Sequence, residues 1–175
     1  YIRLLLVAGI DTTWSAIGAS LWHLAKTPSD RERLVKEPEL MPLAVEELLR
    51  AYSPVTMARE VMKETTISGC PVKPGNMVLL SFPAANRDPL KFEDPDAFVI
   101  DREENRHAAF GLGIHRCVGS NLARLELKVA IEEVIRASGV PFVLLRPTAF
   151  METWVGMLRD GIRDKGGAVL FGDGR

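Results

Sequence analysis

Cys117 lies in the stretch Phe110-Gly111-Leu112-Gly113-Ile114-His115-Arg116-Cys117-Val118-Gly119, shortly before an apolar helical pattern over residues 122–129. A thiol at a helix start lies among unpaired backbone N–H groups and at the positive end of the helix dipole. Both favour the thiolate form. The glycines allow backbone conformations closed to other residues, and they let a flat group approach the chain closely.

Two interpretations of this stretch follow from the residues alone. A thiolate held by a tight loop, with a hydrophobic residue before it, suits the axial ligand of a haem iron. The alternative is a buried free cysteine in an ordinary loop-to-helix connection, which is the commoner situation for a single cysteine.

The ten residues together resemble the haem-binding loop of the cytochrome P-450 family, a match that favours the first interpretation. The resemblance implies that Cys117 is the axial ligand, that Phe110 packs beside the sulfur and that His115 reaches a haem propionate. Gly111 and Gly119 belong to the same expected cofactor-binding loop.

The composition describes a soluble globular protein without electrostatic attraction to nucleic acid or membrane. The 175 residues are 47% hydrophobic and 26% charged, with a net charge of -1. Two cysteines make no disulfide framework, so we expect a reducing, cytoplasmic location. Charged and polar residues interrupt the apolar segment 1–25, which predicts a buried helix rather than a signal peptide or membrane span. Because the chain begins with Tyr1 inside this helix, we expect it to be truncated at the front.

The first helix is predicted over residues 2–26 and contains Ala8-Gly9-Ile10-Asp11-Thr12-Thr13. An acid and two hydroxyls are poor helix formers, so the residues alone fit a polar bend in a core helix as well as a functional site. In the P-450 resemblance this is the oxygen-activating helix. Asp11 and Thr12 then match the acid and alcohol that deliver protons during dioxygen reduction, while Ala8 and Gly9 lie over the haem face.

A short helix through Val35, capped by Ser29 or Asp30, and a third helix over about 40–52 are predicted next. The third helix carries Glu47 and Arg50, which share a face at three-residue spacing. Most such pairs are solvated surface pairs. The resemblance instead implies a buried pair that braces the cysteine loop, with Arg102 as the third member; its role is structural.

A small sheet is predicted from extended segments at 57–61, 64–67 and 76–82, separated by turns at 69–71 and 73–75. Arg59 is by itself an ordinary surface cation, and the resemblance makes it a partner of a haem propionate. Cys70 has no assigned role. His107 is expected to serve the loop structure rather than to bind iron.

The last helix is predicted from Cys117 to about Ala137, and the resemblance ends there. Gly139 ends the helix, and an apolar strand follows over 140–145. Residues 138–175 resemble part of an NmrA-like, atypical short-chain dehydrogenase/reductase, but they lack the glycine-rich turn that binds pyrophosphate. We therefore expect a P-450-like half domain over 1–135 and a tail fragment over 136–175 with no cofactor site.

The resemblance implies a mainly α fold with a small β-sheet, the C-terminal half of the cytochrome P-450 fold, plus a short αβ tail. It implies heme b (iron protoporphyrin IX) and a monooxygenase of bacterial type that inserts one oxygen atom of O2 into a small apolar substrate. In its truncated form, we expect the chain by itself to bind haem poorly and to turn over little or no substrate. The electron donor would be a ferredoxin or flavoprotein. Two alternatives stay open. The first is a non-catalytic haem-binding or inert remnant, and the second is an NAD(P)-binding reductase fragment, which the resemblance of the tail suggests.

Overall fold

The structure, a computed structural model, describes the backbone of residues 2–136 and the side chains from Val7 onwards. Its helices are α1 (Ile2–Lys26), α2 (Pro28–Lys36), α3 (Met41–Ala51), α4 (Phe82–Ala85) and α5 (Ser120–Arg136), with 3₁₀ turns η1 (Pro38–Leu40) and η2 (Gly113–His115). Its strands are β1 (Thr56–Glu60), β2 (Thr65–Ile67), β3 (Cys70–Val72) and β4 (Met77–Ser81). The predicted fold class, mainly helical with a small sheet, is confirmed for this part of the chain.

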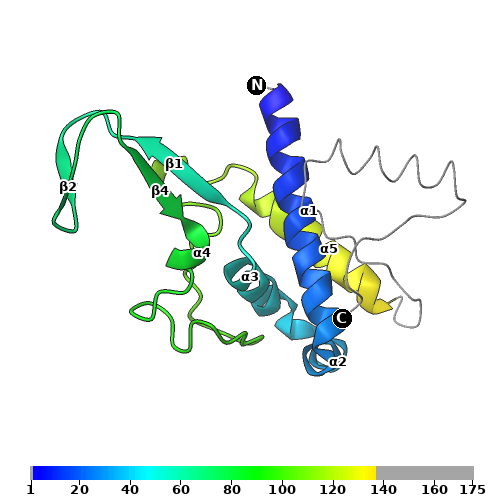
Figure 1. The fold of residues 1–175 in the computed structure, drawn as a ribbon. Coiled ribbons are helices and arrows are strands. Elements are labelled where there is room, and N and C mark those ends of the chain that lie inside the picture. The colour runs from blue at the N-terminus through cyan, green and yellow to red at the C-terminus, as the bar shows by residue number, and fades with distance from the viewer. Residues whose placement is uncertain (1, 137–175) are drawn as a thin grey trace, which may run out of the picture.

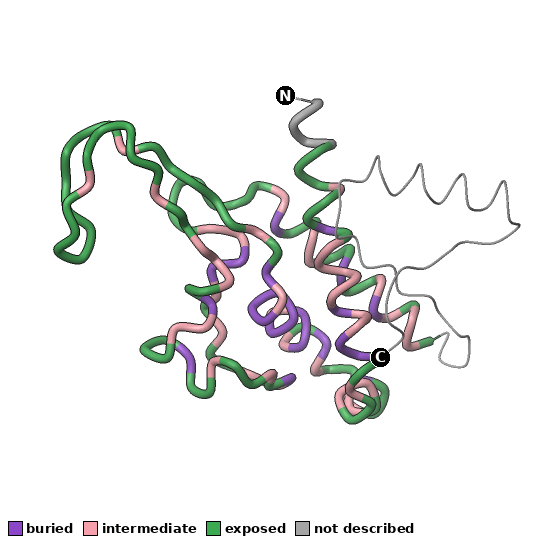
Figure 2. The backbone as a smooth tube through the Cα atoms, in the orientation of Figure 1, coloured by how far each residue is buried: buried purple, intermediate pink, exposed green. Residues whose placement is uncertain are grey.

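The core lies where α1, α3 and α5 meet, and the two β ribbons project away from it (Figure 1). Its innermost side chains come from all three helices and from α2: Leu24, Leu34, Val45, Leu48, Leu127 and Ile131. Figure 2 shows that buried residues concentrate on α3 and on the facing parts of α1 and α5, whereas the ribbons are exposed along most of their length. The helices therefore supply the rigid body that carries the loops.

The predicted extents of the helices are confirmed with two corrections. α2 begins at Pro28, whose fixed φ suits the first helical position, and Thr27 precedes it without a side-chain cap. Ser29 and Asp30 consequently lie inside the first turn, so the predicted cap is wrong. α5 begins at Ser120 rather than at Cys117, because the Ser120 N–H first closes a turn onto the Cys117 carbonyl at 3.3 Å.

The sheet consists of two antiparallel pairs, β1 with β4 and β2 with β3. The predicted strands are confirmed within about one residue at each end, but the predicted turn at 69–71 is wrong at two positions. Cys70 pairs with Ile67, and Pro71 with Thr66. The turn is Ser68-Gly69, where both φ angles are positive, as a two-residue hairpin loop requires.

The predicted domain boundary at 135/136 falls at the end of α5. The predicted helix stop at Gly139, the strand at 140–145 and the reductase-like tail lie outside the described residues.

Candidate functional site

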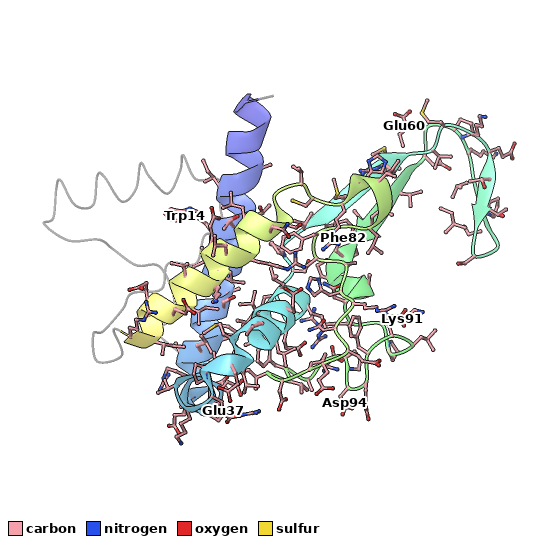
Figure 3. The ribbon with its side chains drawn as sticks, turned by 180° about the vertical axis from the view of Figure 1, so that it is seen from behind. Trp14, Glu37, Glu60, Phe82, Lys91 and Asp94 are labelled. Carbon is pink, nitrogen blue, oxygen red and sulfur yellow. The ribbon has the colours of Figure 1, made fainter. Side chains whose placement is uncertain are left out.

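The cysteine loop is closed by its own backbone. The Cys117 N–H donates to the Phe110 carbonyl at 2.9 Å, and the Gly111 N–H donates to the Ala108 carbonyl at 2.8 Å. Gly111 has φ +70°, and a Cβ there would lie 3.5 Å from the ring of Phe82, which follows β4. Figure 3 shows Phe82 at the junction between the β1–β4 ribbon and the rest of the molecule. The left-handed φ at this position therefore favours glycine, while the space beside it would admit a Cβ in ordinary van der Waals contact.

The Cys117 side chain is free and exposed, and apolar side chains surround it in the sequence. Leu112, Ile114 and Val118 are 70%, 96% and 90% exposed. A Cβ on Gly119 would lie 3.8 Å from Cys117 Sγ, so this side of the sulfur carries no bulk. A soft sulfur ligand on an exposed apolar surface fits a large, flat, mostly apolar metal complex such as a haem.

The polar residues of α1 that were expected to act on oxygen are also exposed. Thr12 Oγ1 donates to the Ala8 carbonyl at 2.7 Å, which holds the hydroxyl against the helix. Asp11 makes no side-chain hydrogen bond within the described part of the chain. A Cβ on Gly9 would meet nothing within 4 Å. α1 runs unbroken through this segment, so its polar face is available to a ligand without any break in the helix.

Arg59 and His115 carry side-chain donors that no carboxylate uses among residues 7–136. Arg59, on β1, donates to the neighbouring Ala58 carbonyl at 2.9 Å and has no carboxylate partner among residues 7–136. His115, at the end of η2, is exposed and makes no side-chain hydrogen bond in the same range. Both can therefore bind an anionic group without breaking an existing ion pair.

Glu47 and Arg50 form a buried bidentate ion pair, 0% and 1% exposed, with N–O distances of 2.7 and 2.8 Å. Arg102 Nε adds a bond of 3.1 Å, so the structure brings the three predicted members together. The Asn105 side chain and the Val99 N–H also donate to the carboxylate, at 3.0 and 2.8 Å. Burial would raise the pKa of Glu47, but the Arg50 hydrogen bond and the other donors lower it below its ordinary value.

The remaining N–H groups of Arg50 tie this pair to the segment before the cysteine loop. They donate to the carbonyls of Asn86, Pro95 and Ala97 at 2.9, 2.7 and 2.8 Å. The fully buried Asn86 side chain in turn accepts the Ala108 N–H at 2.7 Å. The network therefore reaches the loop entrance through Asn86, a residue that the sequence analysis did not assign.

A second carboxylate, Glu46, links α3 to the loop and to α5. It accepts hydrogen bonds from His107 Nε2 at 3.0 Å and from Arg124 Nη2 at 2.9 Å. Burial would raise its pKa, but the bonds from His107 and Arg124 together lower the pKa of Glu46 to about 2. The guanidinium of Arg124 also lies 4.7 Å from the centre of the Phe110 ring, within the range of a cation–π interaction.

The sequence profile of cytochrome P450 matches residues 2–140. The chain belongs to the cytochrome P450 family. Members of this family bind heme b, in agreement with the soft sulfur ligand and the apolar surface around it. Among the described residues, no cluster of three or more His, Cys, Asp or Glu side chains could hold a metal ion.

Relatives and solved structures agree with this assignment. Cytochrome P450 105C1 of Streptomyces is 45% identical over 134 residues, covering 75% of this chain and 35% of that protein. The steroid C26-monooxygenase of Mycolicibacterium smegmatis is 39% identical, covering 85% of this chain and 39% of its own length. The crystal structure of CYP109B1 from Bacillus subtilis matches with a TM-score of 0.74 at 46% identity, covering 77% of this chain and 37% of that one.

The chain thus spans about a third of the length of the relatives it matches. Members of the cytochrome P450 family are oxidoreductases that typically use redox partners. In the described part of the chain, no helix combines the length and the apolar character needed to span a membrane.

Proposed function

We propose that this chain contributes the haem-ligating part of a P450 monooxygenase, which inserts one oxygen atom of O2 into a small apolar substrate. The exposed sulfur of Cys117 supports this proposal most strongly. The loop that carries it has Gly111 in the left-handed region and is closed by the hydrogen bond from the Cys117 N–H to the Phe110 carbonyl. Asn86 links this loop to the buried Glu47–Arg50 pair.

The proposal gives each predicted residue a role. Cys117 would bind the iron, with Phe110 beside the sulfur, and the donors of Arg59 and His115 would bind the propionates. When bound, haem supplies the redox chemistry by which dioxygen is activated.

On α1, Ala8 and Gly9 leave room for the macrocycle face, while Asp11 and Thr12 present an exposed carboxylate and an exposed hydroxyl. The Thr12 hydroxyl needs only to rotate away from the Ala8 carbonyl to donate elsewhere. These two side chains can therefore pass protons towards a ligand on this face of the helix.

A ferredoxin or flavoprotein would supply the electrons, and the cytoplasm is the proposed location. Both described cysteines, Cys70 and Cys117, are free thiols, which a reducing compartment preserves. A small apolar substrate agrees with the exposed apolar side chains that flank Cys117 in the sequence and with the steroid chemistry in the name of one relative.

The test uses the chain with excess haem, because a sulfur exposed on one surface predicts weak binding. The reduced carbon monoxide adduct is recorded for the parent chain, Cys117→Ser and the matched control Cys70→Ser. We expect the absorbance band typical of thiolate ligation in the parent and in Cys70→Ser, and its loss in Cys117→Ser. A thiolate band that persists in Cys117→Ser, or no band in the parent, contradicts the assignment.

A further inference from the structure

His107 is buried in the segment that enters the cysteine loop, with only 3% of its side chain exposed. Its Nδ1 lies 3.1 Å from the backbone nitrogen of Ala109, and its Nε2 lies 3.0 Å from a carboxylate oxygen of Glu46. A backbone N–H can only donate, so Nδ1 must be the acceptor and Nε2 must carry the proton. These two contacts define the tautomer of His107.

The bond from the Ala109 N–H to a side chain two residues earlier has the connectivity of an Asx turn, with an imidazole nitrogen in place of the usual oxygen. The preceding N–H, of Ala108, is also taken by a side chain, that of Asn86. Side chains thus satisfy two successive N–H groups where no helix or strand does so. The next residue, Phe110, provides the carbonyl that accepts the Cys117 N–H.

Glu46 holds this arrangement from outside the loop. Its carboxylate receives the His107 Nε2–H from one side and the Arg124 guanidinium from the other. The Phe110 ring lies 6.3 Å from the His107 ring centre and 4.7 Å from the Arg124 guanidinium carbon. The loop entrance is consequently fastened to both α3 and α5, the helices on either side of it.

We propose that His107 is a positioning residue for Cys117, acting through the acceptor Nδ1 that sets the backbone at Ala109, with Glu46 holding the required tautomer. The residue touches neither the sulfur nor a cofactor. It fixes the backbone at Ala109, where the loop begins, and Cys117 lies at the other end of the same loop. The proposal rests on the proposed function only in taking that sulfur to be an iron ligand.

Two substitutions separate the acceptor from the donor. The oxygen of His107→Asn occupies roughly the place of Nδ1 and can form an ordinary Asx turn with the Ala109 N–H. The amide nitrogen of His107→Gln occupies roughly the place of Nε2 and can keep the bond to Glu46. A role through Nδ1 predicts that Asn rescues the loop and that Gln does not.

The measurement is amide hydrogen exchange by NMR in the full 175-residue chain without haem. The Tyr52 amide, which donates to the Leu48 carbonyl, serves as the reference for overall stability. Relative to Tyr52, we expect the Ala109 and Cys117 amides to exchange roughly tenfold faster in His107→Gln and within about threefold of the parent in His107→Asn. Dividing each exchange rate by that of the Tyr52 amide corrects for any loss of overall stability in the variant.

The ¹⁵N chemical shifts of the His107 ring nitrogens give a second measurement, which does not depend on overall stability. In the parent, ¹⁵N shifts should show an unprotonated Nδ1 and a protonated Nε2. In Glu46→Gln, the fraction of this tautomer should fall as Ala109 exchange rises. Equal exchange in the Asn and Gln variants, a protonated Nδ1 in the parent, or a change at Ala109 without one at Cys117 would each overturn the proposal.

These results are independent of the haem experiment. A parent chain that shows no spectrum dependent on Cys117 removes the proposed function, whereas the exchange pattern still decides whether His107 positions the loop. If the haem spectrum is present and Asn fails to rescue the loop, the positioning role alone is wrong.

Discussion

At the scale of the residue, the site depends on buried charges whose hydrogen bonds are all made. Glu47 is fully buried, yet it receives donors from Arg50, Arg102, Asn105 and the Val99 backbone. A buried ion pair of this kind adds little net stability over apolar packing, but removal of one partner leaves an uncompensated charge. Its value lies in tying α3 to the long segment that leads into the cysteine loop.

Glu47→Gln should therefore destabilise the chain strongly. The change leaves Arg50 and Arg102 without their buried counter-charge, and we expect the free energy of unfolding to fall by about 3–5 kcal/mol. Urea denaturation followed by circular dichroism measures the loss. The matched control is Glu133→Gln on α5, whose pair with Arg136 is exposed, and it should change stability by less than about 0.5 kcal/mol. Similar losses in both variants would show that the buried pair is not a brace.

Glu46 gives a prediction for the pH dependence of stability. Its pKa is about 2 in the folded chain and 4.5 ordinarily, so the ionised form is favoured by folding. The resulting stabilisation is fully present above about pH 4.5 and is lost as the pH falls to about 2. In Glu46→Gln the free energy of unfolding should fall less steeply across this window. Denaturation series between pH 2 and 5 provide the comparison, and parallel curves for parent and Glu46→Gln would disprove it.

The sequence indicates some of these residues and not others. Glu47 and Arg50 are three apart on one helix, so their contact can be expected locally, and resemblance suggested Arg102. Glu46 stands 61 and 78 residues from His107 and Arg124, its partners. Asn86 likewise contacts residues 22 and 36 positions away. A local sequence pattern cannot predict contacts between residues this far apart in the chain, so they become visible only in the folded structure.

At the scale of the element, α5 has two different faces that begin at the cysteine loop. Leu127 and Ile131 are 1% and 0% exposed against α1 and α3, whereas Leu122 and Leu125 are 59% and 57% exposed. The apolar pattern that predicted this helix contains both kinds of leucine, so the sequence alone could not distinguish the packed face from the exposed one. It predicted the helix and misplaced its first residue because the turn at Cys117 precedes it.

Leu127→Ala and Leu125→Ala make a matched pair on this helix. Each removes the same atoms from the same element, but only Leu127 leaves a cavity between α5 and the other core helices. We expect a loss of about 2–5 kcal/mol for Leu127→Ala and less than about 0.5 kcal/mol for Leu125→Ala, measured by chemical denaturation. Comparable losses would mean that the exposed face is packed in solution.

At the scale of the whole molecule, the helical core and the β ribbons differ in how they are held. The ribbons are joined mainly by backbone pairing and carry exposed apolar side chains, among them Met77 and Leu79 at 66% and 68%. The core is held by side-chain packing and by the two carboxylate networks. We therefore expect the helices to keep their amide protection longest and the ribbons to exchange first.

The exposed face of α5 carries apolar side chains that should promote association of the chain in solution. Leu122, Leu125 and Val129 recur at three- and four-residue spacing and are 46% exposed or more, so they form an apolar stripe on the helix. A contiguous apolar surface in water promotes self-association. Replacing Leu122 and Leu125 together by Glu should make the chain more soluble and less prone to associate while its free energy of unfolding stays within about 1 kcal/mol of the parent. Light scattering against concentration measures association, and the substitution of two exposed leucines avoids the packed face that Leu127 occupies. If the double variant associates as readily as the parent, the surface responsible lies elsewhere, and the ribbon residues Met77 and Leu79 are the next to replace.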